Sequence, residues 1–141
     1  MRGLTKKDQM NKFLGKQIMV ELYGCNSDKI NDQSFISGSM TEAAIKAKAT
    51  IVKKYFHEFS PYGISGTIVI AESHINIHTW PEHNYAAIDI FTCGEDLLPL
   101  AAAEHLKSEF EADKMETTEC TRGSMDAIKK LRETQSQYHH P

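Results

Sequence analysis

The sequence has few cysteines, and their spacing suits neither cross-links nor zinc. Only three occur, at Cys25, Cys93 and Cys120, and no Cys-x-x-Cys pair is present. An odd number of widely separated cysteines argues against a disulfide framework, and the missing pair argues against a zinc knuckle. We therefore expect reduced thiols and a cytoplasmic protein.

Long apolar runs and a large charge of one sign are also missing. No apolar run has the length of a membrane span. Lysine and asparagine interrupt the first sixteen residues, where a signal peptide would need an apolar core. Sixteen basic and nineteen acidic side chains give a net charge of −3, which does not indicate binding to a polyanion. We expect neither nucleic acid nor a membrane as a partner.

The composition that remains is typical of a single globular domain. Apolar residues make up 40% and charged residues 25% of the 141 positions. A chain of this length can bury one modest core. We expect one domain over residues 1–141, with flexible segments at 1–15 and at 124–141, where the polarity rises after Gly123.

Six segments have the β-branched, aromatic or alternating residues that are typical of strands. They are residues 16–23, 50–59, 66–71, 73–79, 85–92 and 115–121. The middle segments follow one another through short turns, which favours antiparallel pairing.

Two helices are expected beside these strands. Ser39–Glu42 has the pattern of a capping box and would begin the first helix. Asp96 would cap the second helix, which runs to about residue 112. We predict an α+β fold, a two-layer sandwich of one antiparallel sheet with two helices on one face. The other face would be solvated or covered by a partner.

One short phrase carries the chemistry: Ala71-Glu72-Ser73-His74, at the end of the apolar run 66–70. A serine hydroxyl held against its own preceding carbonyl can attack it and convert the peptide bond into an ester. Elimination would end the first chain at Glu72 and leave a dehydroalanine, which hydrolyses to a pyruvoyl group at the head of residues 73–141. A pyruvoyl ketone can condense with a substrate amine and take up the electrons of decarboxylation, as pyridoxal phosphate does.

The candidate residues also have ordinary interpretations. A serine in an apolar strand is usually a hydrogen-bonded polar residue. By itself Cys93 would be a small buried hydrophobe, and Phe59 and Trp80 would be core aromatics. Glu21, inside an apolar strand, suits either a solvent-facing position or a site.

Three histidines raise the question of a metal site: His74, His78 and His83. On a strand, His74 and His78 point to the same face. Four residues separate their rings by about 13 Å at about 3.3 Å per residue, which is too far for both to bind one ion. We expect no metal.

The wider phrase resembles the prokaryotic S-adenosylmethionine decarboxylase proenzyme family, whose members cut themselves before a serine to form a pyruvoyl cofactor. The resemblance extends over roughly residues 17–95. It rests on the motifs VELYGC at 20–25, HEFSP at 57–61, GISG at 63–66, AESH at 71–74, HTWPE at 78–82 and FTCG at 91–94.

The resemblance implies roles for individual residues and for a cofactor. Carried over position by position, Ser73 is the pyruvoyl precursor, and Glu72 is the new C-terminus and a substrate-binding carboxylate. Ser65 and His78 assist self-processing, and Cys93 is both the proton donor and a processing residue. Phe59 and Trp80 are the pair that sandwiches adenine. The cofactor would be the pyruvoyl group derived from Ser73, with neither a metal nor pyridoxal phosphate.

The same resemblance implies pyruvoyl-dependent decarboxylation of S-adenosylmethionine, whose product donates aminopropyl groups in spermidine and polyamine synthesis. The same chemistry on L-ornithine or L-arginine is the first alternative, and a non-catalytic regulatory paralogue is the second.

Adjacent apolar residues in the strands, such as 68–70 and 86–88, indicate that both sheet faces need burial. We therefore expect a two-fold homodimer of processed αβ protomers, as the resemblance also implies.

Overall fold

A computed structural model of the chain describes residues 12–94 and 96–138. Its strands are β1 (Phe13–Tyr23), β2 (Ile51–Glu58), β3 (Ile64–Ile70), β4 (Ser73–Trp80), β5 (Tyr85–Thr92) and β6 (Lys114–Ser124). Its helices are α2 (Gln33–Lys46), α3 (Pro99–Glu109) and α4 (Met125–Tyr138), with short 3₁₀ turns η1 (Lys29–Asn31) and η2 (Pro81–His83).

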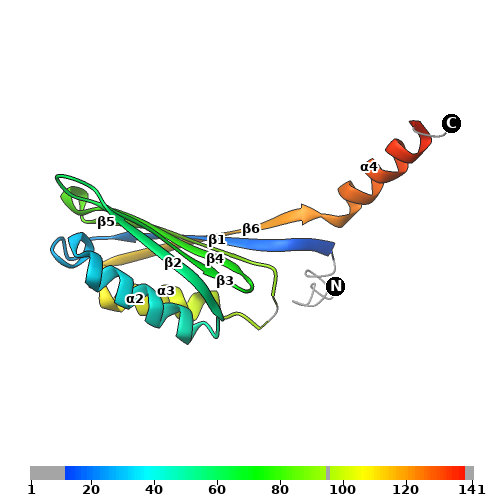
Figure 1. The fold of residues 1–141 in the computed structure, drawn as a ribbon. Helices are drawn as coiled ribbons and strands as arrows, with labels where there is room; N and C mark the ends of the chain where they lie inside the picture. Colours follow the sequence, from blue (N-terminus) through cyan, green and yellow to red (C-terminus); the bar gives the residue numbers. More distant parts are fainter. Residues whose placement is uncertain (1–11, 95, 139–141) are drawn as a thin grey trace.

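The six strands form one antiparallel sheet in the order β2-β3-β4-β5-β1-β6. Helices α2 and α3 lie side by side on one face of this sheet (Figure 1). The predicted α+β fold, a two-layer sandwich with two helices on one face, is therefore confirmed.

The core lies between this sheet and the two helices. Alternation along the strands points every second side chain toward the helices, as Ile75 and Ile77 show on β4, where both are fully buried. Small residues on the helices, such as Ala43 on α2 and Ala102 on α3, are also fully buried and allow close packing. Leu106 and Phe110 complete this layer.

The first helix begins earlier than its predicted capping box. Asp32 caps α2, because its side chain accepts a hydrogen bond from the Phe35 N–H at 3.1 Å. Ser39 lies inside the helix and is only 4% exposed. The capping-box pattern was therefore wrong as a start signal, since a buried helical serine has the same local sequence as a cap.

The second helix also begins elsewhere than predicted. It begins at Pro99, at a position where a missing N–H costs nothing. The residue at the cap position is Leu98, whose side chain makes no capping hydrogen bond. The prediction that Asp96 caps this helix was wrong.

Regular structure extends into both segments that the sequence predicted to be flexible. Strand β1 begins at Phe13, which pairs with Ser124 at the end of β6. Helix α4 follows directly, and its Ala127 N–H donates to the Ser124 hydroxyl at 3.2 Å. The pairing of Phe13 with Ser124 joins residues far apart in sequence, so local patterns gave no sign of it. Residues 1–11 and 139–141 of those segments lie outside the described part.

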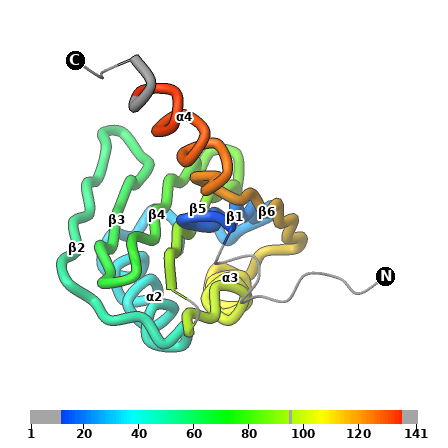
Figure 2. Tube along the Cα trace, turned by 90° about the vertical axis from the view of Figure 1, so that its right-hand side faces the viewer, coloured from blue at the N-terminus to red at the C-terminus, as the bar shows by residue number. Residues whose placement is uncertain are grey.

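The sheet face opposite α2 and α3, here called the open face, carries many large apolar side chains. Strand alternation and register place six exposed ones there: Met19, Tyr23, Tyr55, Val69, Trp80 and, just after β2, Phe59. Figure 2 shows α2 and α3 on the other side of the sheet, and Figure 1 shows that α4, on the side of the open face, extends past the end of the strands. Within the described residues, no helix is both long enough and apolar enough to cross a membrane.

Candidate active site

Ser73 stands at the tight turn between β3 and β4. Strand β3 ends at Ile70 and β4 begins at Ser73, so that only Ala71 and Glu72 connect them, while Ile70 pairs with Ser73 across the turn. The backbone φ of Ser73 is 150°, a value that residues with a β-carbon rarely adopt. The Glu72–Ser73 peptide therefore lies next to a strained residue.

The carbonyl oxygen of Glu72 accepts two hydrogen bonds from one residue. The Cys93 N–H donates to it at 3.0 Å, and the Cys93 thiol lies 3.2 Å from the same oxygen. Cys93 reaches this place because Thr92, the last residue of β5, pairs with Ser73 on β4. Two donors on one carbonyl oxygen are the arrangement that stabilises negative charge during acyl transfer.

The Glu72 side chain is anchored to the backbone near the start of β2. Its Oε1 accepts a hydrogen bond from the Thr50 N–H at 3.1 Å. A β-carbon on Gly94 would lie 3.1 Å from the Cγ of Glu72, so glycine leaves room for this side chain. The carboxylate that the sequence assigned to substrate binding therefore has a structural partner.

Ser65 and His78 form a second cluster, away from Ser73. They face each other on β3 and β4, and the Ser65 hydroxyl and His78 Nδ1 share a hydrogen bond of 2.8 Å. Five residues of β4 separate His78 from Ser73, or about 16 Å at about 3.3 Å per residue. The structure thus brings Glu72, Ser73 and Cys93 together and leaves Ser65 and His78 at the other end of β4.

Trp80 and Phe59 lie on the open face at that other end, and neither is a core aromatic. Trp80 is 41% exposed and Phe59 is 49% exposed. The Trp80 ring stacks on Tyr85 with centroids 5.3 Å apart, and Phe59 contacts His57 edge to face at 4.6 Å.

Sequence reasoning missed a cluster of tyrosines around Glu21 beside Trp80. The Tyr85 hydroxyl donates to the Glu21 carboxylate, and the Tyr23 hydroxyl donates to it at 3.4 Å. Burial, followed by the hydrogen bond to Glu21, raises the pKa of Tyr85. Glu21 is therefore held on the open face by hydrogen bonds from the two tyrosines. A carboxylate inside an apolar strand was the sequence feature that could have indicated this cluster.

A polar row crosses the middle of the open face between the two clusters. Asp89 on β5 accepts hydrogen bonds from Asn76 and Gln17, each at 3.4 Å, and lies 3.1 Å from His74 Nε2. Gln17 in turn accepts from Arg122 on β6. His74 and His78 thus contact different partners on the same face.

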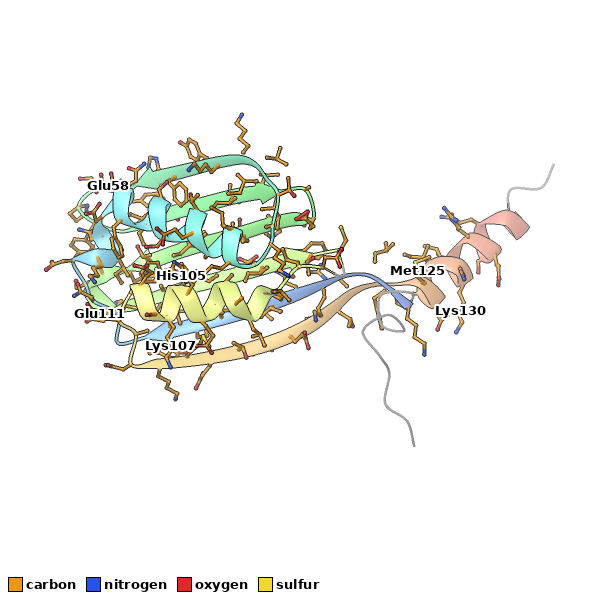
Figure 3. The ribbon with its side chains drawn as sticks, turned by 90° about the horizontal axis from the view of Figure 1, so that it is seen from below. Glu58, His105, Lys107, Glu111, Met125 and Lys130 are labelled. Carbon is orange, nitrogen blue, oxygen red and sulfur yellow. The ribbon has the colours of Figure 1, made fainter. Side chains whose placement is uncertain are left out.

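The remaining histidine contacts of note lie in the helical layer. Among the described residues, one group of His and Glu side chains has its ligand atoms within 4.8 Å of one another: Glu42, His105 and Glu109. His105 Nε2 lies 3.1 Å from a carboxylate oxygen of Glu42, a hydrogen-bond distance, and 3.4 Å from one of Glu109. Figure 3, seen from the helical side, shows His105 on this layer, and the members of the group lie on α2 and α3, whereas Ser73 begins β4.

Comparisons with known proteins place these residues in a family. A family model described as S-adenosylmethionine decarboxylase matches residues 16–123. An S-adenosylmethionine decarboxylase proenzyme of Acidithiobacillus ferrooxidans is 48% identical over 117 residues, which cover 83% of this chain and 88% of that protein. One from Thermotoga petrophila is 48% identical, with coverage of 83% and 90%. The crystal structure of an adenosylmethionine decarboxylase from Aquifex aeolicus superposes with a TM-score of 0.72 at 32% identity, covering 79% of this chain and 92% of that one.

Proposed function

The chain belongs to the S-adenosylmethionine decarboxylase family, and we propose that it cuts itself between Glu72 and Ser73 and then decarboxylates S-adenosylmethionine. The observation that carries this proposal is the double hydrogen bond from Cys93 to the Glu72 carbonyl oxygen, next to the strained Ser73.

Self-cleavage begins with the Ser73 hydroxyl. Its oxygen attacks the carbonyl carbon of Glu72, the C–N bond breaks, and the freed nitrogen takes the proton. Negative charge that develops on the Glu72 oxygen meets the N–H and the thiol of Cys93, at 3.0 and 3.2 Å. Release of the unusual φ at Ser73 favours the same step.

The ester then eliminates, because loss of the Ser73 α-proton expels Glu72 as a free carboxylate. The dehydroalanine that remains takes up water and loses ammonia, which leaves a pyruvoyl group at the head of residues 73–141. Ser73 fits this precursor role, since it is the first residue of β4 and only partly buried. The pyruvoyl ketone supplies an electrophile for the substrate amine and an acceptor for the electrons that leaving carbon dioxide frees.

Cys93 has a second role in decarboxylation. Its thiol is exposed and lies beside the residue that becomes the head of the second chain. We assign to it the return of a proton to the substrate α-carbon. Neither a metal nor pyridoxal phosphate takes part in this scheme.

A second copy of the chain is required to complete each site. A general base must come within hydrogen-bond reach of the proton that it takes, and His78 lies about 16 Å along β4 from Ser73 within one protomer. A two-fold dimer that packs open face on open face brings the partner's Ser65 and His78 to Ser73. The same packing covers the exposed apolar side chains of this face.

Phe59 and Trp80 favour a purine-bearing substrate over L-ornithine or L-arginine. Both rings are presented on the open face, where they can stack on adenine. A distal cation of ornithine or arginine would need a free carboxylate, but Glu21 and Asp89 already accept hydrogen bonds from neighbouring side chains.

The product would be the aminopropyl donor of spermidine and polyamine synthesis. We place the enzyme in the cytoplasm, in keeping with its free cysteines.

Two measurements test this function. Denaturing mass spectrometry should show fragments that correspond to residues 1–72 and to a pyruvoyl-blocked 73–141. Carbon dioxide release from labelled S-adenosylmethionine, L-ornithine and L-arginine should then be seen with the first substrate. An uncut chain without activity would support the regulatory paralogue, and release from ornithine or arginine alone would overturn the substrate.

A further inference from the structure

Helix α4 projects from the body of the protein, and among the described elements it packs mainly against the end of β6. It begins just past β6, and every residue from 129 to 135 is exposed. Figure 3 shows Met125 and Lys130 well beyond the helical layer. A helix of 14 residues is marginally stable in water unless tertiary contacts bury one of its faces.

One face of α4 is apolar. Ala127, Ile128 and Leu131 fall on one side at helical spacing. Leu131 is 60% exposed. Lys129 and Lys130 lie outside this stripe. The family match ends at residue 123, so α4 is an addition to the matched domain.

The position of α4 indicates what covers this stripe. Figures 1 and 2 both place α4 on the side of the sheet opposite α2 and α3, which is the side of the open face. It leaves the sheet at the same end as the site, because Ser73 pairs with Thr92 and Thr92 pairs with Lys16, three residues from the start of β1. A second copy on the open face therefore comes within reach of α4.

We propose that α4 packs against the second copy of the chain, a contact here called the clasp, on the segment 111–116, which includes the first residues of the partner's β6. This inference rests on the dimer of the proposed function. The two-fold axis that brings the partner's His78 to Ser73 runs across the strands, so it lays β6 over the partner's β6 with the ends exchanged. Helix α4, which follows the Ser124 end, then faces the partner's Lys114 end.

Charge and apolar surface on the two segments are complementary. Segment 111–116 carries three acidic residues and one basic residue, and Glu111, Asp113 and Glu116 are all exposed. Glu111 also pairs with Lys29 and Glu116 with Lys114, each at 2.9 Å, so Asp113 is the acidic residue of this segment that pairs with no basic side chain among the described residues. Helix α4 carries Lys129, Lys130 and Arg132 against two acidic residues. The half-exposed Tyr23 ring beside Lys114 offers an apolar surface for Leu131. Opposite charges steer the two copies together, and the apolar stripe supplies burial.

Sedimentation of four proteins tests the clasp without any need for activity: the wild type, a chain that stops after Ser124, Leu131→Asp, and Leu100→Asp as the matched control. Leu100 lies on a helix, as Leu131 does, and is 57% exposed, but its helix α3 belongs to the opposite layer. The truncated chain and Leu131→Asp should raise the dimer dissociation constant at least tenfold, while Leu100→Asp should leave it unchanged. Equal dissociation constants for all four proteins, or a monomeric wild type, would overturn the clasp.

A zero-length cross-link between amine and carboxylate gives a second measurement. Dimers assembled from ¹⁴N and ¹⁵N chains should yield mixed-isotope peptides that join Lys129 or Lys130 to segment 111–116. Cross-links within single-isotope chains alone would contradict the proposal. If the wild type dimerises and cross-links in this way but stays uncut, the clasp stands and the proposed function fails.

Discussion

At the scale of single residues, the Glu72–Ser73 bond is held by its neighbours in a state that suits reaction. Ser73 has a φ of 150°, and the oxygen of the adjacent carbonyl receives both polar hydrogens of Cys93. Strain raises the energy of the intact peptide, whereas the hydrogen bonds lower the energy of the charged state that follows attack. The two contributions can be separated by substitution.

Substitutions of Ser73 isolate the strain. Ser73→Ala and Ser73→Gly should both remain one chain, because neither has a nucleophilic oxygen. The glycine variant should be the more stable by about 1–3 kcal/mol, since glycine adopts this φ without a penalty. Urea unfolding of the two uncut proteins measures the difference. Equal stabilities would show that the backbone at this position is not strained.

Substitutions of Cys93 isolate the thiol. Cys93→Ala keeps the N–H bond to the Glu72 carbonyl but loses the side-chain contact, so cleavage should slow about tenfold or more. Cys93→Ser keeps a side-chain donor and should cut faster than Cys93→Ala. A time course of freshly made protein on denaturing gels compares the rates.

The same variants test Cys93 as the proton donor. Cys93→Ala that has processed should decarboxylate slowly and inactivate itself, because a misplaced proton lets the product amine transaminate the cofactor. Sustained turnover at the wild-type rate would exclude Cys93 from this role.

At the scale of elements, the β3–β4 hairpin sets the position of the site. Its register pairs Ser65 with His78 at one end and Ile70 with Ser73 at the other. Because each residue advances the strand by about 3.3 Å, the hairpin keeps the two clusters apart. Strand β2 supports the hairpin, and the Phe56 ring packs over Gly66 where a side chain would otherwise stand.

Two glycine substitutions test this support. Gly66→Ala would place a β-carbon 2.1 Å from the Phe56 ring and should destabilise the fold by about 1–3 kcal/mol. Gly38→Ala, inside α2, meets no atom within 4 Å and should stabilise it by roughly 1 kcal/mol. Chemical unfolding of both variants against wild type measures the two shifts. A neutral Gly66→Ala would show that Phe56 moves aside freely.

At the scale of the whole molecule, the open face unites the exposed aromatics, the polar row and the Ser65–His78 pair. Within the part of the chain that the structure describes, no second layer covers this face. The dimer of the proposed function would bury this face and would also bring a base to Ser73.

Mixing two inactive variants tests the shared site. Expressed alone, Ser73→Ala should stay uncut and His78→Ala should cut poorly. In a mixed dimer, the Ser73 of the His78→Ala chain meets the intact His78 of the other chain, so up to half of the wild-type cleavage should return for that chain. Mass spectrometry of the co-expressed proteins distinguishes the two chains. No recovery in mixed dimers would place both clusters in one protomer.

The sequence by itself determined the existence of the six strands and the α+β class, and its resemblance to the decarboxylase family located the predicted cut. Alternating apolar residues and the motif Ala71–His74 are local patterns, which can be recognised without knowledge of the fold. Local signals failed where one pattern has two uses: Ser39 has the form of a cap, yet Asp32 caps the helix. Buried and capping serines differ only in what packs around them.

Only the tertiary structure decided which residues meet. Cys93 contacts the Glu72 carbonyl because β5 pairs with β4, and Glu21 contacts Tyr85 because β1 pairs with β5. The same sheet order joins Phe13 to Ser124 and thereby directs α4 away from the body. These pairs are separated by many residues along the chain, so their closeness depends on strand order and register, which no short stretch of sequence contains.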